Sequence, residues 1–419
     1  MQLVCASCAL ATGDDSIACE RCGAVPAFSL SRPTVDAAEL RERFALRRLS
    51  NEPRDQSGVW RFRELLPHID DASIVTLREN VVPTYAAVQG AAYAGVRSVA
   101  YLHLGMNPTA SFKDAGMTVA ISRARERGQH VAVCASTGNT AASMAAYAAR
   151  AGIAAVVVVP KAGVSEAKVA QTLDYGAAVM AIDGDFDRAL GIVRSLDPAR
   201  VAVLNSVNPY RIEGQKCAGY VLLEARDWRA PDWVVMPGGN LGNASAFGKC
   251  FREALALGLI ERLPRIAVVQ ASGAAPFERA FRDGTELVPI RADTAASAIR
   301  IGAPASWRKA LREVRESAGT VIAVPDDEIA DARAVIGRDG VGCEPASAAS
   351  LAGLRRLRDA GAVSTGDDVV LVLTGHVLKD GAFAARYHAR GGRFANPVRR
   401  MNDEASLRSA IDVWVGAHA

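Results

Sequence analysis

A single lysine marks the point where an apolar stretch gives way to a helical one. Lys113 follows the polar turn of residues 107–111, and the nearest acid is Asp114. We expect residues 97–105 to form a strand and residues 117–127 to form a helix. Burial and the positive end of a helix dipole would both lower the pKa of this amine, which is what Schiff-base chemistry needs. Taken alone, the position also fits a solvated surface lysine.

Three further polar loops follow predicted strands. Residues 135–140 read Ala-Ser-Thr-Gly-Asn-Thr, and residues 237–243 read Pro-Gly-Gly-Asn-Leu-Gly-Asn. Each precedes a helical run, where free amides can bind an anion, although a simple helix cap or a tight turn would use the same residue types. The third loop, Thr374-Gly375-His376, ends an apolar strand. In open α/β sheets, ligands bind at the carboxyl ends of strands, so these loops predict one site.

The glycine spacing of residues 237–243 is neither that of a P-loop nor that of a dinucleotide fingerprint. The loop therefore predicts a phosphate group that belongs neither to a triphosphate nor to a dinucleotide.

Six segments together carry a resemblance to a known family. The chain resembles the fold-type II enzymes of pyridoxal 5′-phosphate and, within them, the plant-type branch of the threonine synthases. The segments run in family order between about residue 55 and residue 380, and they are NPTASFKDAGM from Asn107, CASTGNTAASMAAYAARAG from Cys134, NSVNPYRIEGQK from Asn205, MPGGNLGNASAF from Met236, SAIRIGAPASW from Ser297 and GCEPASAASLAGL from Gly342.

The resemblance assigns a role to each matching residue. Lys113 falls on the Schiff-base lysine, Asn139 on the residue that bonds the cofactor's 3′-oxygen, and Thr374 on the hydroxyl that faces the pyridine nitrogen. The loop that grips the cofactor's phosphate matches Gly238, Gly239, Asn240, Leu241, Gly242 and Asn243. Substrate binding matches two groups, one for the carboxylate and one for the substrate's own phosphate: Ser136, Thr137 and Thr140, then Asn205, Ser206 and Arg211.

The resemblance implies a γ-elimination followed by a β-addition. O-phospho-L-homoserine and water would become L-threonine and phosphate, with pyridoxal phosphate as electron sink and the Lys113 amine as general base. A related alternative is a β-replacement on O-phosphoserine, as in cysteate synthase, or a lyase of serine or threonine. Arg211 does not separate these alternatives, since two of the substrates carry phosphate. An inactive regulatory or metal-binding relative is the non-enzymatic alternative, and an intact Lys113 argues against it.

The eight cysteines fall into two groups. Cys134, Cys217, Cys250 and Cys343 are scattered among apolar or small residues, and we expect buried free thiols. The other four stand at zinc-knuckle spacing, C-x2-C-x10-C-x2-C, and are Cys5, Cys8, Cys19 and Cys22. Four thiolates leave no open position for a catalytic water, so they predict a structural zinc. A knuckle that no longer binds metal is the alternative.

Composition favours a globular enzyme of the cytoplasm. The chain has 419 residues, half of them apolar, and a net charge of +4, which is too small to predict a nucleic-acid partner. The N-terminus lacks the basic and apolar stretches of a signal peptide, and the apolar run 151–160 is too short to span a membrane. We expect a small-molecule substrate, no membrane partner and, from the resemblance, a homodimer.

The order of the elements predicts an α/β fold with two doubly wound open-sheet domains and the cofactor in the cleft between them. Eight strands are expected, at Val99–Leu104, His130–Cys134, Ala154–Val159, Ala178–Asp183, Val201–Leu204, Trp233–Met236, Arg265–Gln270 and Val369–Leu373. The predicted parts are a zinc-knuckle-like segment (1–28), an N-terminal helical arm (29–80), a large cofactor-binding domain (81–123 and 207–380), a smaller mobile domain (124–206) and a C-terminal tail (381–419). Residues 284–291 and 302–308 are expected to form surface or lid loops.

Overall fold

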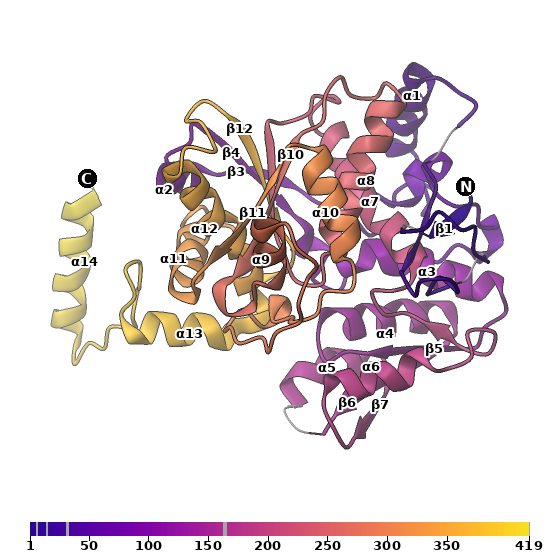
Figure 1. The fold of residues 1–419 in the computed structure, drawn as a ribbon. Helices are drawn as coiled ribbons and strands as arrows, with labels where there is room; N and C mark the ends of the chain where they lie inside the picture. Colours follow the sequence, from indigo (N-terminus) through magenta and orange to yellow (C-terminus); the bar gives the residue numbers. More distant parts are fainter. Residues whose placement is uncertain (6, 14–15, 31–32, 162–165, 419) are drawn as a thin grey trace.

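Two separate parallel sheets carry the fold of this computed structural model, which describes residues 1–5, 7–13, 16–30, 33–161 and 166–418. Figure 1 shows the larger sheet in the upper body of the molecule and the smaller one, with its helices, below it. This arrangement confirms the predicted α/β class with two open sheets. The proposed domain boundaries remain predictions.

The larger sheet has six strands, parallel except for the edge strand β3. Its order is β11 (Thr320–Val324), β10 (Arg265–Ala271), β9 (Trp233–Pro237), β12 (Asp368–Leu373), β4 (Ser98–His103) and β3 (Thr84–Ala86). Successive side chains of a strand point to opposite faces, so Val234 enters one hydrophobic core and Val235 the other. Because helices cover both faces, the central strand β12 is apolar and buried at every residue after Asp368.

Helices cover the two faces of this sheet as separate groups. One face packs against α2 (Val88–Ala94), α11 (Asp326–Arg338) and α12 (Pro345–Asp359). The other packs against α3 (Lys113–Glu126), α7 (Pro209–Glu224), α8 (Gly242–Ala256) and α10 (Trp307–Glu316), while α9 (Pro276–Asp283) follows β10. Short 3-10 turns connect elements at Leu104–Met106, Ser272–Ala274, Ser297–Ile299 and Val377–Asp380.

The smaller sheet has four parallel strands and its own helices. Its order is β7 (Ala178–Ile182), β6 (Ala154–Pro160), β5 (Val131–Ala135) and β8 (Ala202–Val203). The helices α4 (Asn139–Ala151), α5 (Glu166–Asp174) and α6 (Phe186–Arg194) alternate with these strands. We refer to residues 131–203 as the four-stranded unit.

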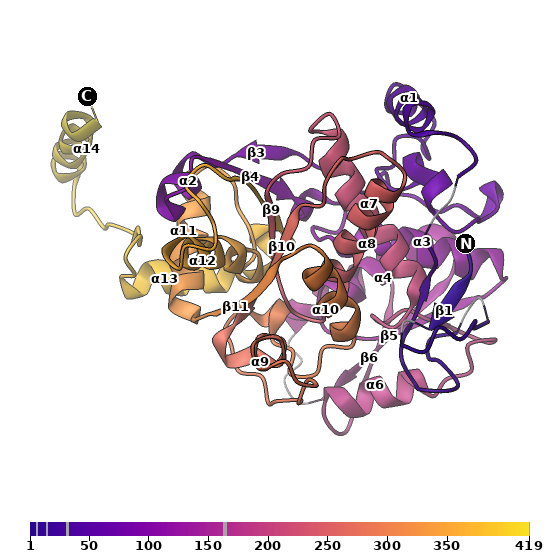
Figure 2. The same ribbon diagram turned by 45° about the horizontal axis from the view of Figure 1, so that its top comes forward.

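The two ends of the chain lie on opposite sides of the body (Figures 1 and 2). At the N-terminus, β1 (Leu3–Cys5) pairs with β2 (Pro26–Phe28), and α1 (Ala37–Arg48) follows. At the C-terminus, α13 (Gly381–Arg390) precedes α14 (Glu404–His418), which stands away from the rest in both views. No helix in the described ranges combines the length and the apolarity that crossing a membrane demands.

All eight predicted strands are present, with ends shifted by a residue or two. The sequence analysis missed β1, β2, β3 and β11. Between residues 29 and 80 the described chain holds one α-helix, and the rest is irregular or forms 3-10 turns at Trp60–Leu65 and Asp71–Ser73. The predicted loop 302–308 is wrong at its end, because α10 begins at Trp307 and Ser306 is 1% exposed.

Candidate active site

Lys113 is the first residue of α3, and the turn before it is held by a buried carboxylate. Asp114 accepts hydrogen bonds from the Thr109 amide at 2.7 Å, from the Thr109 hydroxyl at 2.5 Å and from Ser143 Oγ of α4 at 2.6 Å. Burial raises the pKa of Asp114 to about 6, against these hydrogen bonds. The turn also contains Ala110 in the left-handed region, with φ of 64°. The backbone at Lys113 is thus fixed by its own turn and by α4.

The Lys113 amine lies in a setting that disfavours its charge. Its Nζ lies 4.0 Å from the centroid of the Phe112 ring. Desolvation and, after it, the positive charge of Arg211 lower the pKa of Lys113 to about 7, and the carboxylate of Glu344 opposes both effects. A large fraction of the amine is therefore neutral near pH 7, as a nucleophile or a general base requires.

A buried glutamate joins two of the predicted loops. Glu344 accepts hydrogen bonds from Asn139 Nδ2 at 3.1 Å and from Thr374 Oγ1 at 3.1 Å. The Thr374 hydroxyl also lies 3.0 Å from Ser347 Oγ of α12. Burial raises the pKa of Glu344, while Asn139, Thr374 and the charge of Lys113 oppose that shift. The predicted residues Asn139 and Thr374 are thus held together by one carboxyl group.

The sequence analysis missed Glu344 as a site residue. Glu344 lies in the segment from Gly342 to Leu354, which carries the family resemblance but gave this acid no role. A usable signal was present, because Glu344 is the only acid in a run of small and apolar residues directly before the helix-starting Pro345. Acids are seldom fully buried unless they have polar partners, so this one predicts a polar site around it.

The glycine-rich loop lies between β9 and the start of α8. Leu241 adopts the left-handed conformation with φ of 64° and is the cap residue of α8. A Cβ at Gly238 would lie 2.5 Å from Val268 Cγ1, so this position requires glycine. Asn240 holds the loop in place through two bonds, from its Nδ2 to Ser206 Oγ at 2.9 Å and from the Ala305 amide to its Oδ1 at 2.6 Å.

Two buried side chains at this helix start have polar atoms without a partner. Both amide atoms of Asn243 and the hydroxyl of Ser306 make no hydrogen bond within the described residues. Ser306 Oγ would lie 4.0 Å from a Cβ at Gly242, at the N-terminus of α8. Unpaired buried polar groups are costly, and a phosphate would satisfy them together with the free amides of the helix. Ser306 is a further residue that the sequence analysis did not single out.

These groups fit the chemistry of pyridoxal phosphate. An amine of lowered pKa would bind its aldehyde, a helix start with orphaned polar atoms would bind its phosphate, and a buried hydroxyl would face its ring nitrogen. The residues concerned are Lys113, Asn243 and Thr374.

Arg211 is the strongest candidate for a second phosphate group. Its side chain is 1% exposed, its Nη1 donates to Leu204 O at 3.1 Å, and its Nε has no hydrogen-bond partner in the described chain. Desolvation lowers the pKa of Arg211 to about 10, with a small opposing effect from Cys134. A buried cation with free donors suits a dianion, and the effect of Arg211 on Lys113 places the two close together.

The other predicted substrate residues divide into two kinds. Asn205 uses both amide atoms on the backbone of Ala135, at 3.0 and 3.1 Å, so its side chain positions the end of β5. Ser206 is the hydrogen-bond acceptor for Asn240. In contrast, Ser136, Thr137 and Thr140 are half-buried around the start of α4, and Ser136 Oγ accepts only from the Gly138 amide, at 3.2 Å.

The four N-terminal cysteines form a compact cluster away from these loops. The Sγ atoms of Cys5, Cys8, Cys19 and Cys22 all lie within 4.8 Å of one another. Three of the separations are 3.4, 3.6 and 3.8 Å. Tetrahedral zinc at about 2.3 Å from each sulfur requires separations of about 3.8 Å, so the cluster fits this metal. The remaining four cysteines are buried and free, as expected.

Comparison with known proteins agrees with this chemistry. The family described as "Pyridoxal-phosphate dependent enzyme" matches residues 75–375. The chain is 45% identical over 327 residues to the threonine synthase of Methanosarcina acetivorans, covering 77% of this chain and 80% of that protein. It is 46% identical over 337 residues to the threonine synthase of Synechocystis sp., covering 78% and 86%.

Solved structures of lower identity share the fold. A fungal L-serine ammonia-lyase from Rhizomucor miehei superposes with a TM-score of 0.64 at 19% identity, covering 74% of this chain and 98% of that chain. The processed form of threonine deaminase isoform 2 from Solanum lycopersicum gives 0.61 at 18% identity, covering 92% and 96%. At these identities the likeness concerns the fold alone.

Proposed function

Because the chain belongs to the pyridoxal-phosphate-dependent enzymes and, among them, to the threonine synthases, we propose a role for each group of the site. The overall reaction converts O-phospho-L-homoserine and water into L-threonine and phosphate, the last step of threonine biosynthesis. The observation that supports the proposal best is the position of a lysine of lowered pKa beside a buried arginine with free donors.

Lys113 is the proposed catalytic amine. Pyridoxal phosphate, when bound, supplies an electron sink for charge that develops next to the substrate's α-carbon. Lys113 would hold the cofactor until the substrate's own amine replaces it. Its Nζ, neutral because of the lowered pKa, would then take the α-proton as general base.

Arg211 is proposed to hold the substrate's phosphate and to keep it in place as it leaves. Its guanidinium cannot lose its charge at working pH, and its free Nε gives it a donor for one phosphate oxygen. Ser136, Thr137 and Thr140 would bind the substrate's carboxylate or its tail at the start of α4, where amides are free. Asn205 and Ser206 would act on the same substrate through the loops that they hold.

Thr374 and Asn139 are proposed to orient the cofactor ring. A neutral hydroxyl does not keep a pyridine nitrogen protonated as an aspartate would, so Thr374 would temper the electron sink and limit side reactions. Glu344 fixes both residues through its two oxygens, and this defines their directions before any ligand binds. The proposed phosphate cradle consists of Gly238, Gly239, Asn240, Leu241, Gly242 and Asn243, with Ser306 beside it.

Four further features belong to the proposal. The cysteine cluster is proposed to bind one structural zinc, which its sulfur separations support. A homodimer and a cytoplasmic location remain predictions from the sequence. Closure of the four-stranded unit over the site is also a prediction from the sequence. Such closure would exclude water from the reacting atoms.

Two substrates compared side by side test the reaction. The purified holoenzyme is given O-phospho-L-homoserine, or O-phospho-L-serine with sulfite, and released phosphate and amino-acid products are measured. We expect threonine and phosphate in equal amounts from the first and no cysteate from the second. Turnover of only the second would assign the chain to β-replacement and leave the fold and cofactor unchanged.

An arginine variant tests the proposed phosphate contact. Arg211→Met should lower kcat/KM for O-phospho-L-homoserine by about 10- to 100-fold, because a hydrogen bond to a charged group is lost. Arg200→Met, at an exposed position of the chain, is the matched control and should leave kcat/KM unchanged. Equal values for both variants would show that Arg211 does not bind the substrate.

A further inference from the structure

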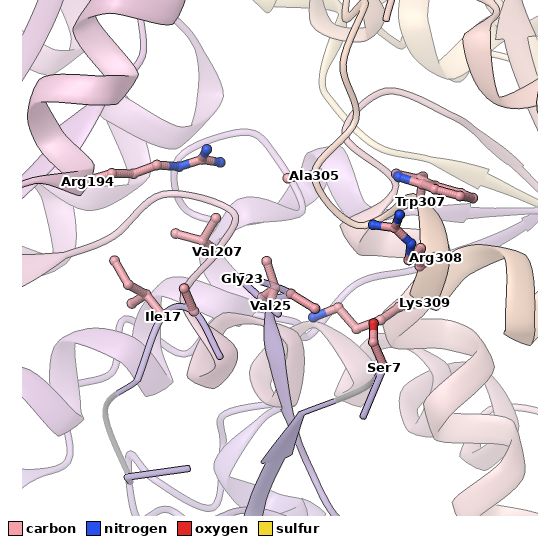
Figure 3. Close-up of a pocket in the computed structure, with 12 residues that line it drawn as sticks. Ser7, Ile17, Gly23, Val25, Arg194, Val207, Ala305, Trp307, Arg308 and Lys309 are labelled. Atoms are coloured by element: carbon pink, nitrogen blue, oxygen red, sulfur yellow. The ribbon is translucent and has the colours of Figure 1, made fainter. Parts of the chain in front are cut away.

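A cavity of about 340 Å³ lies beside the active site, where four parts of the chain meet. Its walls come from the N-terminal cysteine segment, the end of α6, the link between β8 and α7, and the start of α10. Figure 3 shows Arg194 and Lys309 reaching toward its centre from opposite sides. None of the proposed catalytic or cofactor-binding residues lines it.

The lining of this cavity is cationic and lacks a compensating acid. Arg194, Arg308 and Lys309 line it, whereas no aspartate or glutamate is among the described residues of its wall. Arg308 forms an ion pair with Glu286 outside the cavity, at 2.5 Å. For Arg194, no ion pair is found within the described chain. A concave surface of one sign raises the local concentration of ligands of the opposite sign.

Lys309 is the buried member of this set. It is 6% exposed, and its Nζ makes one long hydrogen bond, 3.4 Å to Pro26 O. Desolvation lowers the pKa of Lys309 to about 8, while the carboxylate of Glu213 opposes that shift. Glu213 is already paired with Lys216 and Lys249, each at 2.6 Å. The ammonium of Lys309 therefore lacks a close counter-ion of its own.

The dipole of the helix that carries Lys309 also favours a bound anion. Arg308 and Lys309 lie in the first turn of α10, where the helix dipole repels positive charge and favours negative charge. Glu286 compensates the charge of Arg308, whereas Lys309 has no close acid, so an anion in the cavity would lower the energy of this helix start.

The cavity shares its wall with the proposed phosphate cradle. Ala305 lines the cavity, and its amide donates to Asn240 Oδ1 at 2.6 Å. Val207 lines it on another side and follows Ser206, whose hydroxyl accepts from Asn240 Nδ2 at 2.9 Å. Asn240 is therefore hydrogen-bonded to Ala305 in one wall of the cavity and to Ser206, the neighbour of Val207, in another wall. A ligand in the cavity would therefore lie against residues that hold the proposed phosphate cradle in place.

We propose that this cavity binds a small phosphate-bearing anion, either inorganic phosphate or a phosphate monoester, at a site distinct from the catalytic one. Arg194 supplies a guanidinium fork and Lys309 a point charge, the two groups that bind phosphate in proteins. The apolar wall around Val25 and Trp307 suits the carbon skeleton of a monoester. Such a ligand joins α6 of the four-stranded unit to α10 of the larger sheet, and its binding is coupled to the cofactor grip through Asn240.

Counting bound phosphate tests the proposal. Equilibrium dialysis of the holoenzyme with radiolabelled inorganic phosphate should give two sites per chain, one at Arg211 and one in the cavity. Lys309→Met and Arg194→Met should each weaken the cavity site by at least about tenfold and leave the other intact. Arg211→Met should do the reverse, so failure of the catalytic assignment and failure of this proposal give different results.

Controls and competitors complete this test. Arg200→Met, which removes an exposed arginine outside the cavity, should keep both sites. Unlabelled glycerol 3-phosphate and unlabelled phosphate then compete for the cavity. If a monoester is the ligand, glycerol 3-phosphate should displace the label at the lower concentration. If phosphate itself is the ligand, unlabelled phosphate should do so. A single phosphate per chain that is lost with Arg211→Met would overturn the proposal. So would a second phosphate that survives in both Lys309→Met and Arg194→Met.

Discussion

At the scale of single residues, the site depends on a lysine whose charge the fold disfavours. Lys113 has a pKa lowered to about 7 by desolvation, helped by Arg211 and opposed by Glu344. The same environment that makes its amine reactive also opposes folding at any pH below the ordinary lysine pKa of 10.5, because the folded protein must either bury a charge or give up a proton. Function and stability therefore conflict at this position.

This conflict predicts a pH dependence of stability in the cofactor-free protein. Between pH 7 and the ordinary lysine pKa of 10.5, the unfolded chain binds more protons at Lys113 than the folded one. The contribution of Lys113 to the free energy of unfolding therefore rises with pH in this range. Lys113→Met should remove that rise, measured as the free energy of unfolding in urea at several pH values. Lys161→Met, at an exposed lysine, should keep it. Equal slopes for wild type and Lys113→Met would contradict the lowered pKa.

Glu344 provides a second prediction at this scale. Glu344→Gln keeps the shape but turns one acceptor oxygen into a donor, so Asn139 and Thr374 cannot both continue to donate to it. We expect kcat to fall by about 10- to 100-fold and the absorbance of the bound cofactor to shift. Glu328→Gln, whose carboxylate pairs with Arg356 near the surface, serves as the matched control. An unchanged spectrum and an unchanged rate in Glu344→Gln would remove Glu344 from the site.

At the scale of elements, α7 and α8 position both phosphate-binding groups, and a buried ionic network joins them. Lys216 contacts Glu213 at 2.6 Å and Glu253 at 2.8 Å, and Lys249 contacts the same two acids at 2.6 and 3.1 Å. Tyr220 donates to Glu253 at 2.7 Å. Two cations and two anions thus balance between the helix that carries Arg211 and the helix that starts at the glycine loop.

Breaking this balance should destabilise the protein strongly. Glu253→Gln leaves a buried ammonium without full compensation, which costs about 3–5 kcal/mol in comparable buried pairs. The expected readout is a lower midpoint of urea denaturation, with the exposed Glu261→Gln as control. A midpoint equal to that of the control would mean that the four charges are not coupled in the folded protein.

Apolar patterning explains which elements could be predicted. The strands β9 and β12 contain continuous apolar runs, at residues 233–237 and 369–373, each followed by a polar turn, and both strands are central in the sheet. By contrast, β3 is short and exposed at the edge of the sheet, and neither β3 nor β11 was predicted from the sequence. The 29–80 region looked helical from its charged residues, but Trp60 and Phe62 pack as a 3-10 turn against the core.

The site could be predicted as a set of loops but not as a network. Strand-end position and residue type pointed to the loops that hold Lys113, Asn139 and Thr374, and the family resemblance assigned these residues their roles. Their mutual contact through Glu344 needed the fold, because that acid comes some 200 residues after Asn139 in the sequence. Asn205 was predicted to bind the substrate from its place in a motif. In the structure its side-chain amide instead exchanges two hydrogen bonds with the backbone of Ala135, which its residue type could not reveal.

At the scale of the whole molecule, the cysteine segment is tied to the helices that support the site. Lys309 Nζ donates to Pro26 O and Lys249 Nζ to Ser29 O, both at 3.4 Å, and the Phe28 and Tyr210 rings lie 4.9 Å apart. A metal in the cluster would therefore stabilise the segment and the contacts that it makes with α7, α8 and α10.

Metal analysis provides the prediction for this scale. We expect one zinc per chain after gentle purification, lost in Cys8→Ser, together with a lower Tm after chelation. Cys250→Ser, at a buried thiol of α8 outside the cluster, should keep the metal. Less than about half an equivalent of zinc in the wild-type protein would contradict a resident structural metal.

The most direct test of Lys113 as the catalytic amine is the product formed from O-phospho-L-homoserine by wild type and Lys113→Ala. We expect threonine and phosphate in equal amounts from the wild type. We also expect a rate at least about 100-fold lower in Lys113→Ala, because the general base is lost, and an unchanged rate in Lys161→Ala. Threonine formation by Lys113→Ala at the wild-type rate would contradict the assignment of the catalytic amine.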